Sequence, residues 1–414
     1  MVREAKKSPA NSPPLFKHRP FALFWLARVL SALAFQVSAV AVGWQVYALT
    51  GSAFNLGMVG LVQFLPMVLL ALAAGHVADR YDRRVIVRTC QAMEGCAIAL
   101  LALGSYSGWV HTLGIFAAVA TVGAARSFEN PTMAALLPGL VPAAALPKAA
   151  ALSSSAMQTA TIVGPALGGL LYVMGPATPY AIAAVLFMSA SFLASLIKHE
   201  QSPVRSEAHG IRSVFSGIAF IRSQPAVLGA ISLDLFAVLL GGATALLPIY
   251  ARDILHTGAW GLGILRSSPA VGALAMSLLI TRYPLDRGVG SKMFAAVVVF
   301  GLATVIFALS SSLLLSIGAL MILGAADVIS VVIRITLVQL TTPDHMRGRV
   351  SAVNSLFIGT SNQLGEFESG VTAALFGTVP SVVLGGLGTI AVAMIWMILF
   401  PELRKVDSFE SMEH

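Results

Sequence analysis

Apolar segments long enough to cross a lipid bilayer recur along the whole of this 414-residue chain. A spanning helix needs about 20 apolar residues, because the hydrocarbon core of a bilayer is about 30 Å thick. We predict an all-α integral membrane protein with twelve spans, at residues 21–49, 54–78, 85–107, 111–137, 150–173, 180–197, 226–250, 260–281, 293–309, 313–340, 350–378 and 381–400. Twelve such helices leave no room for a large additional domain.

The composition indicates that lipid is the main solvent of this chain. Hydrophobic residues make up 57% of it and charged residues only 11%, whereas soluble domains contain roughly 25% charged residues. The net charge of +8 would suggest a nucleic-acid partner for a soluble protein. Here it indicates topology, because Lys and Arg collect in cytoplasmic loops, and we expect no nucleic-acid partner.

The positions of the basic residues predict the orientation. With a cytoplasmic N-terminus, 21 of the 26 Lys and Arg residues lie on the cytoplasmic side, four lie within spans, and Arg252 lies outside. This distribution fits an even number of spans with both termini in the cytoplasm. The predicted organisation is a cytoplasmic tail at 1–20, a six-helix bundle at 21–197, a cytoplasmic linker with an interfacial helix at 198–225, a second six-helix bundle at 226–400 and a cytoplasmic tail at 401–414.

The two halves resemble each other at an offset near 201 residues. The segment 123–126 (GAAR) lines up with 324–327 (GAAD), and the segment 164–169 lines up with 365–370. Several such matches in the same order indicate an internal repeat. Parallel six-span repeats are the architecture of alternating-access transporters.

The loop between the second and third spans carries a signature. It reads GHVADRYDRR over 75–84 and resembles the loop motif G-x-x-x-D-R-x-G-R-R of the major facilitator superfamily, with Asp82 in place of the usual glycine. The resemblance implies a conformational latch on the cytoplasmic side of the outward-facing state. Its residues would be Gly75, Asp79, Arg80, Arg83 and Arg84. Arg83 can bridge to a neighbouring helix through paired hydrogen bonds, although ordinary basic loop residues would explain the same pattern.

The predicted fifth span contains the sequence GPALGG at 164–169. It resembles the G-P-x-x-G-G core of a motif associated with exporters of the superfamily, and its residues are Gly164, Pro165, Gly168 and Gly169. Small residues let helices approach closely, and proline bends a helix. An ordinary close-packed helix crossing is the alternative.

Further segments at 233–236, 261–266 and 346–350 resemble the enterobactin-exporter-like and macrolide-efflux-like branch of drug:proton antiporters in this superfamily. The resemblance covers nearly the whole chain. It implies the major facilitator fold, a multi-pass protein of the bacterial inner membrane, and export of small, often amphipathic compounds. We expect a monomer whose partners are a small-molecule substrate, protons and the lipid bilayer.

Charged side chains within spans are candidate functional residues, because a charge at the bilayer centre costs at least about 2.5 kcal/mol on insertion scales. The candidates for proton coupling or for the substrate cavity are Asp234, Glu366, Asp327, Arg28, Gln363, Asn362, Arg266, Arg126 and Glu129. Two further carboxylates within spans are Glu94 and Glu368.

Helical spacing separates some of these candidates. Glu366 and Glu368 are about 200° apart on a helix, so we expect Glu366 to face the cavity and Glu368 to face a neighbouring helix. A second polar stripe on the first span should line water or a partner helix. It comprises Arg28, Ser31, Phe35, Ser38, Val42 and Gln45.

For each buried ion, a structural salt bridge is the alternative to a functional role. Arg126 and Glu129 are three residues apart and could pair on one helix. Asp234 could pair with Arg28 or with another arginine, and Arg334 could be a structural latch near the cytoplasmic end of its span.

Catalytic and nucleotide-binding motifs are absent from the sequence. It contains no phosphate-binding loop, so we expect no direct use of ATP, and its eight histidines show no metal-ligand spacing. We therefore expect no enzyme activity, cofactor or metal. The favoured hypothesis is proton-coupled export of small amphipathic molecules. The alternatives are a facilitator or importer of a small metabolite without proton coupling, and a scaffold or receptor that does not transport.

Overall fold

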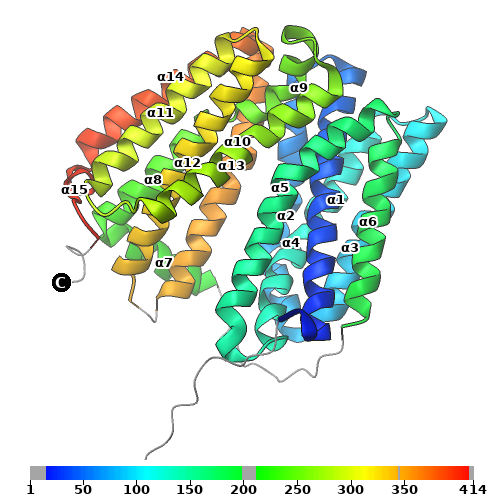
Figure 1. Cartoon of the computed structure of the whole chain (residues 1–414), viewed down its shortest axis with the longest axis horizontal. Coiled ribbons are helices and arrows are strands. Elements are labelled where there is room, and N and C mark those ends of the chain that lie inside the picture. Colours follow the sequence, from blue (N-terminus) through cyan, green and yellow to red (C-terminus); the bar gives the residue numbers. More distant parts are fainter. Residues whose placement is uncertain (1–14, 198–210, 344–345, 410–414) are drawn as a thin grey trace, which may run out of the picture.

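The computed structural model describes residues 15–197, 211–343 and 346–409, and within these ranges every regular element is a helix (Figure 1). The helices of the first half are α1 (Arg19–Thr50), α2 (Ala53–Arg80), α3 (Arg83–Ser107), α4 (Thr112–Leu136), α5 (Leu146–Val173) and α6 (Thr178–Ser195). Those of the second half are α7 (Ile211–Ser223), α8 (Pro225–Leu240), α9 (Leu247–Ile249), α10 (Gly258–Arg282), α11 (Val289–Leu309), α12 (Leu313–Thr341), α13 (Arg347–Phe376), α14 (Thr378–Leu399) and α15 (Pro401–Lys405).

Ten helical segments among the described residues are long and apolar enough to cross a membrane. The helices α4 and α13, which occupy the predicted fourth and eleventh spans, are as long but are not in this group. Both carry several of the polar candidates named above. The multi-pass helical architecture is therefore confirmed, and the count of twelve spans stays a prediction.

The predicted seventh span at 226–250 is not one continuous helix. Helix α8 ends at Leu240, and the chain continues through a short 3₁₀ turn, α9 and a π-helical turn at Tyr250–Ile254. The break falls at Gly241 and Gly242, where the backbone of Gly242 lies directly against the carbonyl group of Gly365 on α13. A side chain at Gly242 would collide with α13, so this crossing requires glycine.

The long helices form two groups that lie side by side in Figure 1. Equivalent helices pack against each other in both groups: α2 with α4 and α10 with α12, α3 with α6 and α11 with α14, and α1 with α5 and α8 with α13. Each group uses a repeated glycine for its closest crossing, because Gly123 lies against the backbone of Gln63 and Gly324 lies against that of Pro269. This recurrence agrees with the repeat read from the sequence.

The two groups meet through α5 with α10 and through α2 with α13. A Cβ atom added at Gly263 would lie 2.6 Å from the carbonyl oxygen of Pro165, and one added at Gly57 would lie 2.8 Å from the Cα atom of Gly370. These contacts lie where α2 and α10 begin. We call this the closed end, and we call the opposite end, where α1 begins and α2 ends, the basic end.

At the basic end, α5 and α13 expose polar side chains. Ser155, Gln158 and Thr159 of α5 are exposed, as are Ser351 and Ser355 of α13. Polar groups are costly to place in hydrocarbon, so these halves of the two helices face water. The two groups are thus in contact at the closed end and separated near the basic end.

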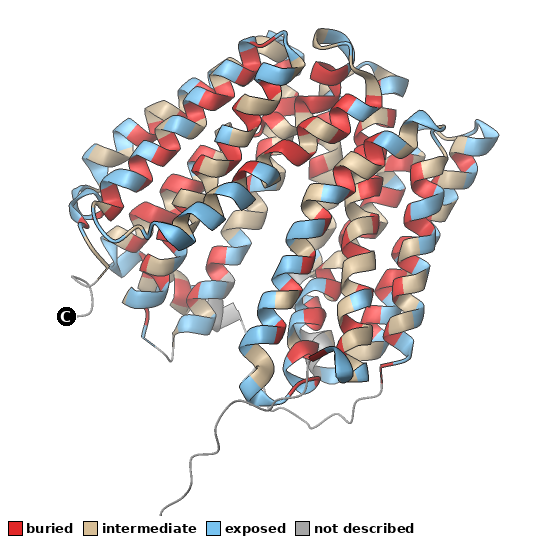
Figure 2. Ribbon diagram, in the orientation of Figure 1, coloured by how far each residue is buried: buried red, intermediate tan, exposed pale blue. Residues whose placement is uncertain are grey.

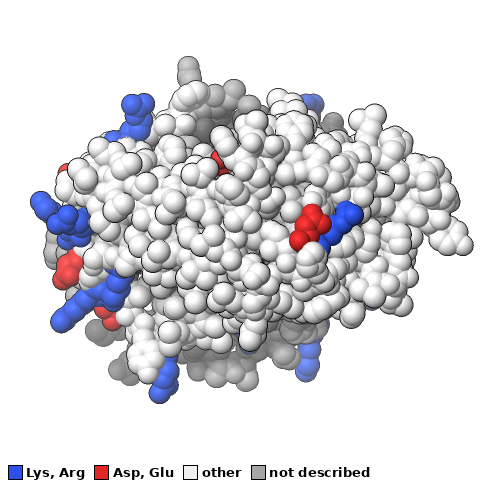
Figure 3. All heavy atoms as spheres, turned by 90° about the horizontal axis from the view of Figure 1, so that it is seen from above, with Lys and Arg blue, Asp and Glu red and all other residues white. Residues whose placement is uncertain are grey.

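Large apolar side chains cover the outer faces of the helices, where pale blue exposed residues alternate with buried ones (Figure 2). Leu69, Leu278, Leu314 and Ile398 are among the most exposed. Seen from the closed end, the surface shows few charged side chains away from its edges (Figure 3). The apolar belt formed by the outer faces of the helices is suited to lipid rather than to water.

Helix α7 forms at the residues predicted for the interfacial helix. Its Ile221 is buried in a cluster with Val227 of α8 and Val350 of α13, and Gly217 lies against the backbone of Arg349. Phe215 on the same helix is exposed. The linker helix is therefore docked on the second group, and the rest of the predicted linker, at 198–210, lies outside the described residues.

Candidate functional site

A cavity of about 160 Å³ lies between the two groups of helices. Its apolar wall includes Phe35, Val42, Leu56, Val59 and Val122. Its polar members are Ser38, Gln63, Arg266, Gln363 and Glu366. The lining comes from α1, α2, α3 and α4 of the first group and from α10, α13 and the turn at 245–248 of the second.

Three residues predicted for the cavity line it: Arg266, Gln363 and Glu366. The guanidinium group of Arg266 also donates a hydrogen bond of 3.3 Å to the carbonyl oxygen of Ala39, which links α10 to α1. Asn362 is exposed, is not part of this cavity's lining and donates to the carbonyl oxygen of Ile358 on its own helix, so its role stays a prediction. Its side chain lies about 100° around the helix from that of Gln363.

The predicted polar stripe on α1 faces the protein interior. Phe35, Ser38 and Val42 line the cavity. Ser31 donates a 2.8 Å hydrogen bond to Glu129 of α4, and Gln45 donates a 2.9 Å hydrogen bond to Ser105 of α3. The stripe is therefore confirmed as one that lines a cavity and partner helices.

The first group holds a buried charged cluster behind Phe35, which forms part of the cavity wall. The guanidinium group of Arg126 lies 3.9 Å from a carboxyl oxygen of Glu129 and 3.9 Å from the centroid of the Phe35 ring. The other oxygen of Glu129 accepts hydrogen bonds of 2.8 Å from Ser31 and from Gln91. The pairing of Arg126 with Glu129 foreseen as an alternative is thus present. Neither residue lines the cavity directly, and neither does Arg28, so a role of these three in proton coupling stays a prediction.

The second group holds a separate cluster. A terminal nitrogen of Arg334 on α12 lies 3.0 Å from a carboxyl oxygen of Asp234 on α8, and the same nitrogen donates to Asn354 on α13. Asp234 is 6% exposed and Arg334 is 2% exposed. Asp327 lines the same narrow gap as Asp234. The partner of Asp234 is therefore Arg334 rather than Arg28, and neither acid reaches the central cavity.

Sequence reasoning did not identify Asn354 or the contacts at the closed end. The hydroxyl group of Tyr47 at the end of α1 donates a hydrogen bond to Asp253, and Arg252 lies 5.5 Å from the centroid of the Tyr47 ring. These contacts tie the first group to the π-helical turn that follows α9. The available signal was that Arg252 is the lone basic residue predicted on its side of the membrane.

The residues of the predicted latch lie at the basic end. Arg83 donates a 2.9 Å hydrogen bond to the carbonyl oxygen of Ala135, near the end of α4. This bridge to a neighbouring helix is present as predicted, with a single hydrogen bond rather than a pair. Arg80 is exposed and Gly75 has open space around it, while the side chain of Asp79 lies outside the described part of the chain. The latch function stays a prediction.

Asp82, which replaces the usual glycine of the motif, caps the start of α3. It accepts a 2.8 Å hydrogen bond from the backbone nitrogen of Arg84 and forms a 2.6 Å ion pair with the Arg84 side chain. Arg84 also donates to the carbonyl oxygen of Ile197, beyond the end of α6. Asp82 therefore orients the arginine that joins α3 to the end of α6.

This cap leads to a prediction about pH. Hydrogen bonds from Arg84 hold the pKa of Asp82 below its usual range. The ionised Asp82 therefore stabilises the fold fully at any pH above the pKa that Asp82 has in the unfolded chain. This stabilisation is lost as the pH falls through the lower pKa that Asp82 has in the folded protein. Asp82→Asn keeps a capping side chain but removes the ion pair with Arg84, so we expect it to lower stability at pH 7 by about 0.5 kcal/mol and to flatten part of the acid dependence. Thermal unfolding in detergent between pH 3 and pH 7 measures both effects. The control is Asp286→Asn, in the exposed loop before α11, which should retain the wild-type acid dependence.

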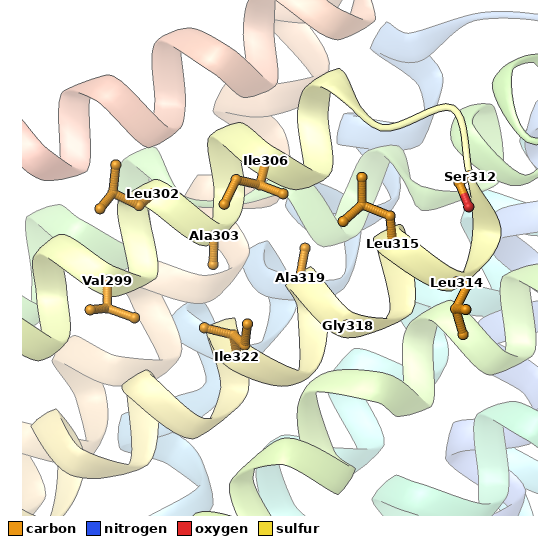
Figure 4. A pocket seen from close by; sticks show the side chains of 10 residues that line it. All are labelled: Val299, Leu302, Ala303, Ile306, Ser312, Leu314, Leu315, Gly318, Ala319 and Ile322. Atoms are coloured by element: carbon orange, nitrogen blue, oxygen red, sulfur yellow. The ribbon is translucent and has the colours of Figure 1, made fainter.

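A larger hollow of about 670 Å³ lies on the outer side of α11 and α12 (Figure 4). It is lined by aliphatic side chains such as Val299, Ile306 and Leu315, with Ser312 at its edge. It is open to the lipid-facing side and draws on only one group of helices. Because its lining is apolar apart from Ser312, the hollow lacks the polar groups that orient a bound solute. No group of His, Cys, Asp and Glu within the described ranges could hold a metal ion.

A chain with this many apolar helices, two repeated groups and a polar cavity between them has the features of a membrane transporter. The family model for transmembrane secretion effectors matches residues 10–414. The chain belongs to this family of the major facilitator superfamily, as the sequence resemblance predicted. It is a multi-pass protein of the bacterial inner membrane and a transporter, not an enzyme.

Curated relatives and solved structures agree with this assignment. The chain is 26% identical over 397 residues to the enterobactin exporter EntS of Citrobacter koseri, and 25% identical to that of Escherichia coli, with 95% of each chain covered. Among solved structures, a bacterial homologue of the lysosomal transporter Spinster, in an inward-facing unoccupied conformation, aligns with a TM-score of 0.73 at 13% identity over 95% of this chain and 97% of that one. A mutant of the nucleoside transporter NupG aligns with a TM-score of 0.71 at 13% identity, over 92% and 100% of the two chains.

Proposed function

We propose that this protein is a proton-coupled exporter of small amphipathic molecules that works by alternating access. The observation that carries this proposal is the cavity between the two groups, which combines an apolar wall with Arg266, Glu366 and Gln363. An amphipathic solute needs both kinds of surface. The lining comes from both groups, so relative movement of the groups would change its exposure.

We further propose twelve spans in two six-helix bundles, with both termini in the cytoplasm. The bundles comprise residues 21–197 and 226–400, joined by a cytoplasmic linker at 198–225, with tails at 1–20 and 401–414. The recurring helix pairings support two equivalent bundles. The basic residues Arg80, Arg83 and Arg84 support a cytoplasmic location for the basic end. On this orientation the described conformation is closed to the outside.

Export, rather than import, is supported by the relatives, which are named enterobactin exporters. The glycines of the exporter-type motif also have specific contacts. Gly168 lies against the backbone of Val37 on α1, and Gly169 lies against α10 at Ala259 and Gly263. The motif thus lies at the junction of the two groups at the closed end, where an exporter must open to release its substrate.

Proton coupling is supported by carboxyl groups that are enclosed by protein. Glu366 lines the cavity, and Asp234 and Asp327 lie in the second group. An acid in a membrane interior marks a proton or substrate pathway more often than a purely structural site. We propose that Glu366 is the acid whose protonation competes with substrate, because it is the one of these three that reaches the cavity.

The test uses inverted membrane vesicles in which the protein is overproduced in a strain lacking its main efflux pumps. Enterobactin and the amphipathic dye ethidium serve as probes, and a pH gradient, acidic inside, is imposed. We expect gradient-dependent accumulation of at least one probe, which a proton ionophore abolishes. Accumulation of neither probe above empty vesicles would contradict export of this substrate class.

The same vesicles separate the proposal from the alternative of a facilitator or importer without coupling. We expect Glu366→Gln to lose gradient-driven accumulation while retaining exchange of labelled for unlabelled probe across the membrane. If flux in the wild type is independent of the gradient, the facilitator reading is correct. The control is Glu402→Gln, the same change at an exposed position on α15, which should leave both modes intact.

A further inference from the structure

The first group of helices contains a buried acid that none of the sites above uses. Glu94 on α3 has 0% of its surface exposed, and neither of its carboxyl oxygens has a hydrogen-bond partner among the described residues. The charged groups that act on it are a second carboxyl group, that of Glu129, and the guanidinium group of Arg126, both on α4. We propose that Glu94 and Glu129 share one proton and form a proton-binding site in the first group, an inference that extends the proton coupling proposed above.

The hydrogen bonds around the pair decide which acid carries the proton. Glu129 accepts from Ser31 and Gln91 at 2.8 Å each, and the guanidinium group of Arg126 lies 3.9 Å away, so two donors and one positive charge surround its carboxylate. Within the described part of the chain, Glu94 has no such donor. An ionised carboxylate without a partner is far costlier to bury than a neutral acid, and two adjacent carboxylates cannot both ionise easily. The proton therefore resides on Glu94, whose hydroxyl group donates to Glu129.

The charged groups around the pair set the consequence of losing that proton. Arg28 of α1 and Arg126 of α4 interact electrostatically with Glu129, and the thiol group of Cys90 lies on the same side of α3. On the other side, α6 presents the apolar residues Phe187 and Met188 to α3. With the proton bound, two guanidinium groups face one carboxylate. When Glu94 releases its proton to water, two carboxylates face two guanidinium groups, and the excess positive charge is gone.

Arg126 connects this charge change to the central cavity. Its guanidinium group lies over the ring of Phe35, 3.9 Å from the centroid, and Phe35 forms part of the cavity wall. In the protonated state the excess positive charge lies directly behind that ring. After deprotonation, the second carboxylate attracts Arg126 toward the pair and away from Phe35. The binding of one proton can thus alter the cavity without any proton entering it.

The test is infrared difference spectroscopy of the purified full-length protein in lipid, comparing neutral with alkaline pH. We expect the wild type to show a carbonyl band of a protonated carboxylic acid that disappears at alkaline pH and shifts in heavy water. Glu94→Gln should remove this band, and Glu129→Gln should move it to the frequency of an isolated acid. Asp327→Asn separates any contribution of the second group, and Glu402→Gln on α15 is the exposed control that should leave the band unchanged.

A Glu94→Gln spectrum identical to that of the wild type overturns the inference, because glutamine has the shape of the protonated acid but cannot release the proton. An unchanged band in Glu129→Gln also overturns it, since the proton would then not be shared. Transport in vesicles provides an independent readout. If flux proves independent of the pH gradient while the Glu94 band is present, the coupling proposal fails and the proton site stands.

Discussion

Replacing Gly263 with valine is expected to reduce transport by roughly tenfold or more while leaving helix content unchanged. A Cβ atom at this position would lie 2.6 Å from the carbonyl oxygen of Pro165, and glycine is what allows α10 to touch α5 at the closed end. The bulk of valine would separate the two groups there. The protein would then accumulate with its closed end open and could not complete the cycle.

The expected shift can be measured directly by electron paramagnetic resonance. Spin labels on cysteines introduced at Met174 and Leu314, both exposed at the closed end of different groups, report the distance between the groups after Cys90 and Cys96 are replaced by serine. Gly263→Val should lengthen the mean distance. Gly318→Val is the matched control, because Gly318 has no neighbouring atom within 4 Å of an added Cβ atom. An unchanged distance together with normal transport would contradict the role of this crossing.

Replacing Arg334 with leucine is expected to destabilise the second group by about 3–5 kcal/mol. The loss leaves the carboxylate of Asp234 buried beside Asp327 without its 3.0 Å partner, and it removes the donor to Asn354. A marked fall in melting temperature in detergent should follow. Arg282→Leu, which removes an exposed arginine at the end of α10, should change the melting temperature little.

A double-mutant cycle distinguishes a structural pair from a functional one. Adding Asp234→Asn to Arg334→Leu removes the unpaired charge, so most of the lost stability should return. If the double variant is stable and retains gradient-driven transport, the pair is structural. If the double variant is stable and still exchanges probe across the membrane but has lost gradient-driven transport, Asp234 takes part in coupling. Failure of Asp234→Asn to restore stability would contradict the ion pair as the source of the effect.

Much of the fold follows from local patterns in the sequence. Apolar runs of bilayer length predicted the long helices, and most of their bounds agree to within a few residues, because burial in lipid requires every backbone group to be paired within its own helix. The break in the seventh span was missed because Gly241 and Gly242 look like ordinary membrane glycines. The close crossing of α13 at Gly365, which lies directly against the break, is visible only in the tertiary structure.

The sequence identified several residues of the candidate site, but it did not indicate which of them contact each other. The rarity of charge in the spans singled out Asp234, Glu366 and Arg266, and the helical period placed Glu366 toward the cavity. The same reasoning placed Asn362 on that stripe, but a stripe drawn along a helix does not specify which of its members line the cavity and which are exposed.

The sequence by itself determined that this chain lies in a membrane, that its halves are repeated and that few of its charges are buried, because these properties depend on local composition and spacing. The tertiary structure alone decided which buried charges meet. Asp234 pairs with Arg334, one hundred positions away, and Glu94 faces Glu129 with no donor of its own among the described residues. Such pairings depend on the rotation and crossing of packed helices, which no single helix encodes.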